Sequence, residues 1–175
     1  ILTVARIQQG KIELKLEVID IANIASQAID VMQSKMDERN IVFTSELPPR
    51  PLHIKADSLR IIQVIINLLD NATKFTEPGG RISLLVKEEP NEVTIAVRDS
   101  GVGINTKELP HIFEIFNQID ASADKKNEGI GIGLALVKNI VEMHNGRVTA
   151  NSEGKGRGSK FIISLPSENI SHAEF

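Results

Sequence analysis

Hydrophobic and polar residues follow two different periods along the chain, and each change of period marks a new predicted element. Apolar residues at helical spacing predict helices over 20–38, 57–75 and 133–145. Alternating or short apolar runs predict strands at 11–18, 41–45, 52–55, 81–87, 92–98, 147–151 and 159–165. Thr106 is expected to cap a further short helix with Glu108 in its first turn. The polar stretch 117–128 has no usable period and is predicted to be a functional loop.

The helix predicted over 57–75 has an unusual polar face. Successive residues turn by about 100° around a helix, which gathers the polar side chains into one stripe: Arg60, Gln63, Asn67, Asp70, Asn71 and Lys74. The opposite face is apolar, with Ile61, Ile62, Ile65, Leu69 and Ala72. Asparagine is a poor helix former, so the pair Asn67 and Asn71 beside Lys74 favours a surface that presents amide groups and one positive charge. On this helix alone, an ordinary solvated face carries equal weight.

Three glycine clusters follow this helix in order, and they reduce the weight of the solvated-face interpretation. Their sequences are Asp99-Ser-Gly-Val-Gly103, Gly129-Ile-Gly-Ile-Gly-Leu134 and Gly154-Lys-Gly-Arg-Gly-Ser159. Asp99 comes directly after a hydrophobic strand, where a carboxylate can accept a hydrogen bond from an amino group such as that of adenine. The second cluster opens a predicted helix, whose free backbone amides suit phosphate groups.

Neighbouring side chains of the 57–75 helix suit the same ligand. The amide oxygen of Asn71 is a reasonable ligand for Mg²⁺ that is bound together with phosphates and water. Lys74, one turn further on, is placed to reach a phosphate oxygen. Phe75 packs either against a base or in the core, and both alternatives stay open.

Composition narrows the class of protein. A chain of 175 residues, 41% hydrophobic and 25% charged, fits one soluble globular domain. The net charge of -3, without an isolated basic run, argues against nucleic-acid binding. The absence of cysteine excludes disulfides and cysteine-bound metals and suits the cytoplasm. No apolar run reaches the roughly 18 residues of a membrane span, and the start has no signal-peptide pattern.

Taken together, these residues resemble the catalytic and ATP-binding domain of sensor histidine kinases. This family is a branch of the superfamily that includes gyrase, heat-shock chaperones and mismatch-repair ATPases. The resemblance extends over nearly everything from Ile1 to Pro166. The matching motifs are the N box and its approach (Asp57–Arg60, Gln63, Asn67–Phe75), the first glycine box (Asp99–Gly103), the F box (Phe113–Phe116), the second glycine box (Gly129–Leu134) and the third (Gly156–Phe161).

The resemblance implies an α/β (α+β) two-layer sandwich. A mixed, mostly antiparallel sheet would carry three helices on one face, with a mobile ATP lid. Residues 1–10 would be the end of the second helix of a dimerisation and histidine-phosphotransfer domain. Residues 11–166 would form the ATP-binding catalytic domain, and 167–175 a polar tail.

The resemblance also implies roles for the residues of the 57–75 helix and the base site. Asn71 would bind Mg²⁺, while Asn67 and Lys74 would line the triphosphate as the catalytic residues. Phe75 would stack on the base and Asp99 would bind the adenine amino group. The other residues implied near the base are Gly101, Gly103, Ile104 and Ser159.

The glycines and lysines of the loop would serve the phosphates. The residues implied at the end of the lid are Gly129, Gly131, Gly133 and Leu134. Lys125 or Lys126 would supply the positive charge of the lid. Phe113 and Phe116 would anchor its start or pack in the core. Many relatives have an arginine or lysine just after the F box, whereas this chain has Asn117-Gln-Ile-Asp120, a form associated with hybrid sensor kinases.

Asn67 bears on the type of reaction. In the gyrase and chaperone branches this position is a glutamate that activates water, and an amide cannot accept a proton at neutral pH. The resemblance therefore implies transfer of the γ-phosphoryl group to a histidine rather than efficient hydrolysis. An anti-sigma-type serine kinase and a nucleotide-binding regulatory module without transfer activity remain as alternatives.

The acceptor histidine is expected on another domain. None of the four histidines (His53, His111, His144 and His172) is followed by the acidic residue, arginine and proline of the acceptor motif. We therefore expect no autophosphorylation by this chain alone. The implied partners are the dimerisation domain of the parent kinase and the receiver domain of a response regulator. The chain itself is expected to be a cytoplasmic monomer and the parent a homodimer, with membrane attachment of the parent left open.

Overall fold

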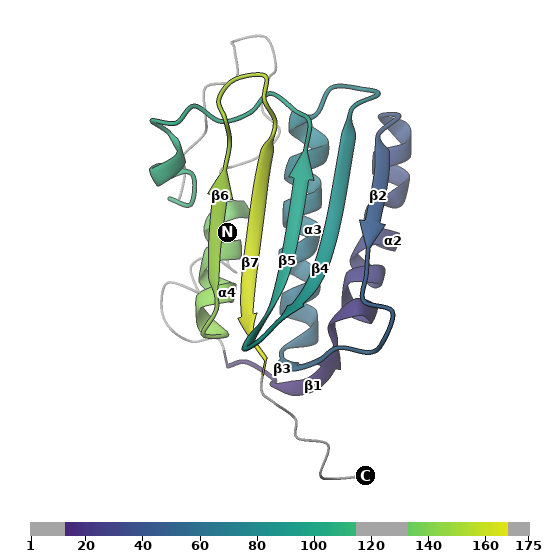
Figure 1. Cartoon of the computed structure of the whole chain (residues 1–175), viewed down its shortest axis with the longest axis vertical. Coiled ribbons are helices and arrows are strands. Elements are labelled where there is room, and N and C mark those ends of the chain that lie inside the picture. The colour runs from purple at the N-terminus through teal and green to yellow at the C-terminus, as the bar shows by residue number, and fades with distance from the viewer. Residues whose placement is uncertain (1–12, 115–132, 168–175) are drawn as a thin grey trace.

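Three helices lie side by side against one face of a five-stranded sheet (Figure 1). The computed structural model describes residues 13–114 and 133–167. The strands, in spatial order, are β2 (Val42–Glu46), β4 (Arg81–Glu89), β5 (Glu92–Asp99), β7 (Ser159–Pro166) and β6 (Arg147–Asn151). β2 and β4 are parallel, whereas the other neighbouring strands are antiparallel. The expected two-layer sandwich with a mixed, mostly antiparallel sheet is confirmed.

The helices are α2 (Ile21–Glu38), α3 (Ser58–Phe75) and α4 (Gly133–Met143). Aspartates begin the first two. The side chain of Asp20 accepts a hydrogen bond from the backbone amide of Ala22, and that of Asp57 accepts one from Arg60. Each carboxylate satisfies an amide that has no partner within the helix, and this fixes the first turn. The sequence therefore predicted the start of α2 and α3 to within one residue.

The strand predicted over 11–18 is mostly wrong. The observed strand β1 (Glu17–Asp20) pairs with β3 (His53–Ala56) in a separate antiparallel two-stranded sheet. This pairing ends at Glu17 and Ala56, because β3 stops there and the backbone continues directly into α3. Beyond that point the backbone amide of Lys15 donates to the carboxylate of Asp57 instead of to a strand. Alternation of apolar residues was present there, but no partner strand was available.

The short helix expected after Thr106 is also placed differently. The side chain of Asn105 accepts from the amide of Lys107, and its carbonyl accepts from Glu108 and Leu109. The first helical turn that forms is the 3₁₀ helix η1 (Leu109–His111). An asparagine turn of this kind competes well with a threonine cap.

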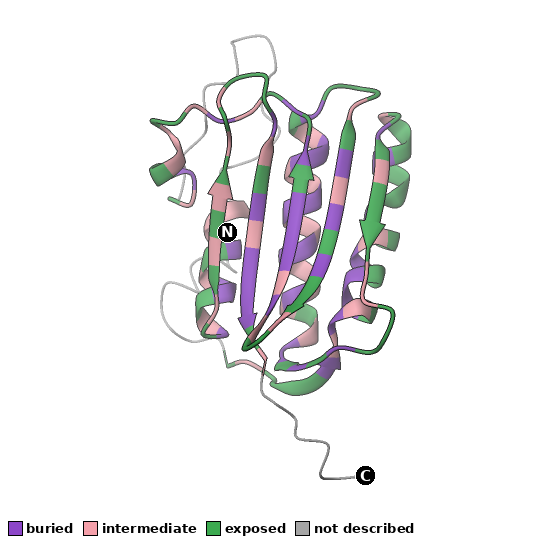
Figure 2. Ribbon diagram, viewed as in Figure 1, coloured by how far each residue is buried: buried purple, intermediate pink, exposed green. Residues whose placement is uncertain are grey.

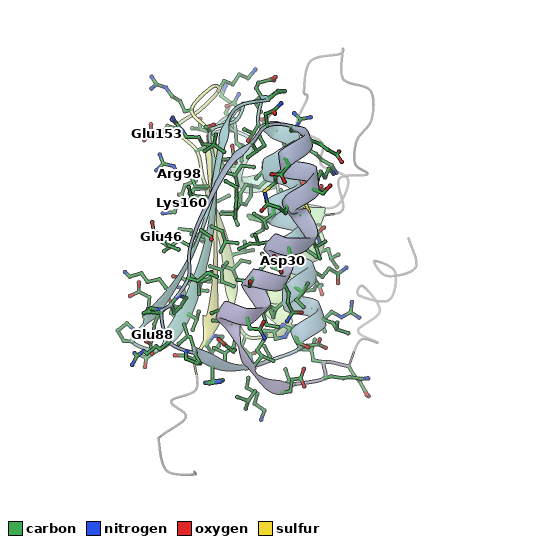
Figure 3. All side chains as sticks on the ribbon, turned by 90° about the vertical axis from the view of Figure 1, so that its right-hand side faces the viewer. Asp30, Glu46, Glu88, Arg98, Glu153 and Lys160 are labelled. Carbon is green, nitrogen blue, oxygen red and sulfur yellow. The ribbon has the colours of Figure 1, made fainter. Side chains whose placement is uncertain are left out.

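The core lies between the sheet and the helices. Alternate residues of the central strands face the helices and are buried, namely Ile82, Leu84, Val86, Val93, Ile95, Val97, Phe161, Ile163 and Leu165 (Figure 2). On α3 the buried residues include Val64 and Leu68, whereas Ile62, expected in the core, is half-buried. Within the described ranges no helix covers the other face of the sheet, and the side chains of Glu46, Arg98 and Lys160 project from it (Figure 3).

Candidate functional site

The polar stripe of α3 is half-buried rather than solvated. Asn67, Asn71 and Lys74 all have intermediate exposure. The Nδ2 atom of Asn67 is buried and has no hydrogen-bond partner among the described residues. Buried amides without a partner are rare because their desolvation is costly. An unsatisfied donor at this position therefore favours a ligand-binding stripe over a solvated helix face.

Asp70 lies in this stripe between two lysines. Its carboxylate oxygens are 2.5 Å from Lys35 Nζ and 2.9 Å from Lys74 Nζ. Burial by itself raises the pKa of Asp70, but the hydrogen bonds and charges of Lys35 and Lys74 outweigh it and lower the pKa below its usual 3.8. Lys74, predicted to reach a phosphate, is thus held by an ion pair one turn from Asn71.

We expect Asp70→Asn to lower the free energy of unfolding by about 1 kcal/mol at neutral pH, the upper range for partly exposed ion pairs. The lowered pKa means that the unfolded chain binds the proton more readily. The contribution of Asp70 is therefore present above a pH of about 4 and is lost as the pH falls below that value. Urea unfolding of both proteins between about pH 7 and about pH 2.5 measures this effect, and the difference between them should shrink with acid.

Asp30→Asn is the matched control for this measurement. Asp30 is an exposed carboxylate on the outer side of α2, and it has no partner among the described residues (Figure 3). Its replacement should leave the free energy of unfolding nearly unchanged at every pH. A difference between wild type and Asp70→Asn that did not vary with pH would contradict a stabilising Asp70 carboxylate.

Asp99 ends β5 as a buried carboxylate. Its side chain is 6% exposed and accepts from two neutral donors. The backbone amide of Gly101 lies 2.8 Å from Oδ1, and the hydroxyl of Ser159 lies 2.5 Å from Oδ2. No cation pairs with Asp99 among the described residues. These two donors orient the carboxylate and leave it acceptor capacity for a further amino group. Asp99 and Ser159, both predicted for the base site, are therefore in direct contact.

Two glycine loops close around this carboxylate. A methyl group on Gly101 would lie 2.2 Å from the carbonyl oxygen of Phe75, and one on Gly103 (φ +70°) would lie 2.0 Å from that of Gly154. Gly158 (φ +69°) likewise approaches the backbone of Asp99. Only residues without a side chain allow the end of α3 and the first and third glycine boxes to approach so closely. The end of the N box and the first and third glycine boxes thus pack directly against one another and form one wall around Asp99.

The start of α4 faces the same stripe of α3. A methyl group on Gly133 would lie 3.8 Å from Asn67 Oδ1. Gly133, the first residue of α4, therefore lies beside the side-chain amide of Asn67. The amides of the first turn of a helix lack internal partners and attract anions. Leu134 is half-buried against the core and fixes this end of the helix. Gly133 thus lies beside Asn67, and its implied contact with the phosphates stays a prediction.

Several predicted residues lie outside the described ranges. They are Phe116, Lys125, Lys126, Gly129 and Gly131. The expected lid, 117–128, lies there as well. Their implied roles stay predictions.

Three hydrophobic side chains have different environments around the site. Phe75 is 42% exposed, which decides against the core alternative for this ring. Phe113 packs edge-to-face on Phe161, with ring centroids 6.3 Å apart, and so has a core role. Ile104 is buried, and its backbone amide donates to Ser152 Oγ. Phe75 is therefore exposed and available to contact a base. Ile104, in contrast, is buried and belongs to the core next to the site.

Ser152 and Lys35 contribute to the site although the sequence analysis did not select them. The Ser152 hydroxyl donates to the carbonyl of Gly158 and accepts from the amide of Ile104, which links the first and third glycine boxes. Lys35 reaches the stripe from the neighbouring helix α2. The position of Ser152 just before a glycine cluster was a weak indication of its contacts. The contact of Lys35 depends on how α2 packs on α3, which no local pattern indicates.

A metal ion bound at this site would take only part of its coordination shell from the protein and the rest from a bound ligand. Within 13–114 and 133–167, no group of three His, Cys, Asp or Glu side chains could hold a metal ion. The Asn71 amide makes no hydrogen bond to a described residue and is half-buried. One neutral oxygen fits Mg²⁺, which commonly takes one or two protein ligands and completes its shell with phosphates and water.

A buried carboxylate at the end of β5, an Asn67 amide without a partner among the described residues, close-packed glycines and the start of α4 beside α3 are the features of a nucleotide-binding domain. Residues 56–169 match the family described as Histidine kinase-, DNA gyrase B-, and HSP90-like ATPase. The chain belongs to this family, and it is an ATP-binding domain.

Two curated relatives are kinases by name. The circadian input-output histidine kinase CikA of Synechococcus elongatus is 35% identical over 172 residues, which are 97% of this chain and 23% of CikA. The sensor protein kinase WalK of Staphylococcus aureus is 30% identical over 177 residues, covering 100% of this chain and 42% of WalK. The chain therefore spans less than half the length of these relatives.

Solved structures show the same fold. The catalytic domain of the histidine kinase ThkA superposes with a TM-score of 0.77 at 25% identity, covering 88% of this chain and 99% of that one. Full-length ShkA in complex with AMPPNP gives 0.81 at 30% identity, covering 95% of this chain and 34% of ShkA.

None of the helices in the described part of the chain has the length and hydrophobicity to cross a membrane.

Proposed function

We propose that this chain is the ATP-binding catalytic domain of a two-component sensor histidine kinase. It binds ATP with Mg²⁺ and donates the γ-phosphoryl group to a histidine on a separate dimerisation and histidine-phosphotransfer domain. The names of the histidine kinases CikA and ThkA and of the sensor protein kinase WalK support this reaction class, and the complex of ShkA with AMPPNP supports nucleotide binding. Residues 11–166 are the proposed catalytic domain, and 1–10 the end of the preceding one.

The observation that carries the proposal is Asn67. Its buried Nδ2 lacks a described partner and can donate to a phosphate oxygen, but the amide cannot take a proton from water. The neighbouring carboxylate, Asp70, is held by two lysines and is a poor base. The stripe is thus suited to hold a phosphoryl group until an external nucleophile arrives, which is the requirement for transfer rather than hydrolysis.

Each remaining residue has a proposed task. Bound Mg²⁺ would neutralise phosphate charge, and the Asn71 amide would hold it. Lys74 contributes a positive charge near the phosphates while it stays paired with Asp70. Asp99 accepts from the adenine amino group, and the exposed ring of Phe75 contacts the base. The amides at the start of α4 bind phosphate oxygens.

The proposed partners follow from this reaction. They are the histidine-bearing domain of the parent kinase, taken as a homodimer, and the receiver domain of a response regulator. ThkA has been solved in complex with the response regulator protein TrrA, and that chain superposes with a TM-score of 0.77 at 25% identity. We further propose that the chain acts in the cytoplasm, which the absence of cysteine supports.

A phosphotransfer assay tests the proposal. The chain is mixed with the histidine-phosphotransfer domain of the parent kinase, produced as a separate polypeptide, and with ATP labelled at the γ-phosphate. Label that is acid-labile and alkali-stable should appear on that domain, as a phosphohistidine does. No label should appear on the chain alone, or on the partner when its acceptor histidine is replaced by glutamine.

Other outcomes distinguish the alternatives. Acid-stable label on serine would replace the proposal with a serine kinase. Saturable ATP binding without any transfer would favour a nucleotide-binding regulatory module. Rapid release of inorganic phosphate without a partner would make the chain a hydrolase and contradict the role given to Asn67.

A further inference from the structure

His144 joins the end of one helix of the site to the start of the other. It directly follows α4 and is 7% exposed. Its Nδ1 lies 2.7 Å from the carbonyl oxygen of Ile140, and its Nε2 lies 3.0 Å from the backbone nitrogen of Asp57. A backbone amide can only donate, so Nε2 accepts and Nδ1 carries the proton given to the carbonyl. The contacts thus specify a neutral imidazole in one tautomer.

Each of these contacts is made at a helix end. Ile140 belongs to the last turn of α4, and its carbonyl accepts from both the backbone amide and the ring Nδ1 of His144. Asp57 is the N-cap of α3, and its carboxylate already binds the amides of Lys15 and Arg60. The imidazole therefore fixes the axial position of α4 against the first turn of α3. A buried ring between two backbone groups leaves little freedom to slide.

The start of α4 and the middle of α3, both away from His144, form the proposed phosphate side of the site. α3 runs from Asp57 to Asn67 while α4 runs back from Gly133 to His144, so the two helices are antiparallel. Gly133 stands beside Asn67 at the far end from the imidazole. Because helices transmit axial shifts along their length, a displacement at His144 would move the start of α4 relative to Asn67.

We propose that His144 is a positioning residue for the phosphate groups of the nucleotide. It sets the register in which the amides at the start of α4 and the amide of Asn67 face the same phosphates. The proposed base side is formed by Asp99 and Ser159 of the sheet, and among the described residues no hydrogen bond joins His144 to either of them. This inference rests on the proposed nucleotide-binding function and adds a residue remote from the ligand.

The test compares ligands with and without phosphates. Calorimetry on the full chain measures the binding of AMPPNP with Mg²⁺ and of adenosine. His144→Ala should weaken AMPPNP about five- to tenfold, the size of a lost hydrogen-bonded contact. The affinity for adenosine should stay within about twofold of wild type. His144→Gln, whose amide can again accept from Asp57, should recover most of the AMPPNP affinity.

Val86→Ala serves as the control for lost stability. Val86 is a buried core residue of β4 away from α4, and its truncation should affect both ligands equally or neither. Equal losses of AMPPNP and adenosine in His144→Ala would overturn the positioning role. If the alanine variant failed to fold, a glutamine variant with weakened binding of both ligands would overturn it likewise. Absence of AMPPNP binding by wild type would instead refute the proposed function.

Discussion

Replacing Asp99 with asparagine should weaken ATP binding by about 10- to 100-fold, the range for a hydrogen bond to a charged group. The asparagine oxygen can still accept from Gly101, and the Ser159 hydroxyl can turn to accept from the new amide. The fold should therefore survive. The amide places a donor where the carboxylate offered an acceptor, so the adenine amino group loses its partner. Calorimetric titration with ATP and with GTP measures both affinity and base preference.

The same chemical change at an exposed position provides the comparison. Asp30→Asn on α2 alters one carboxylate far from the site and should leave ATP binding as in wild type (Figure 3). The preference of Asp99→Asn for ATP over GTP should largely disappear. An unchanged preference in this variant would remove Asp99 from the base site, whatever its effect on overall affinity.

Replacing Asn71 with alanine should abolish the benefit of Mg²⁺ for nucleotide binding. The Asn71 amide is the proposed metal ligand, and metal neutralisation of phosphate charge contributes several kcal/mol to phosphoryl-transfer transition states. We expect ATP binding in Mg²⁺ to fall by about 10- to 100-fold, with a small change in EDTA. Isothermal titration calorimetry in the two buffers separates these contributions.

Asn23→Ala is the corresponding helix-surface control. Asn23 is exposed on α2 and makes only a local contact with Gln27. This variant should respond to Mg²⁺ as wild type does. If Asn71→Ala lost equal affinity with and without Mg²⁺, Asn71 would be a phosphate or packing residue rather than the metal ligand.

Periodicity predicted most of the fold because the core is simple. Alternate apolar residues of β4, β5 and β7 face three amphipathic helices, and each pattern matches its observed element closely. Prediction failed where pairing rather than pattern decides. Residues 13–16 alternate but have no partner strand, and Asn105 forms a turn where Thr106 was expected to begin a helix.

The sequence predicted which residues form the candidate site, but it predicted less well which of these residues contact one another. Asp99 and Ser159 are 60 positions apart, yet the register of β5 and β7 places them directly opposite. Pairing of Asp70 with Lys35 depends on how α2 packs on α3, a tertiary contact without a local pattern. The contacts of His144 with Asp57 and Ile140 were hidden for the same reason, because no local pattern around this histidine indicates them.

The contact between Asp99 and Ser159 also has a consequence for biosynthesis. β5 pairs with β7, the last strand of the described residues, so the wall around Asp99 remains incomplete until Ser159 has been translated. A nascent chain that ends before Ser159 has the N box and the first glycine box but lacks the hydroxyl that orients the carboxylate. Because a ligand stabilises only a state that binds it, we expect nucleotide to stabilise the domain only after β7 has paired with β5.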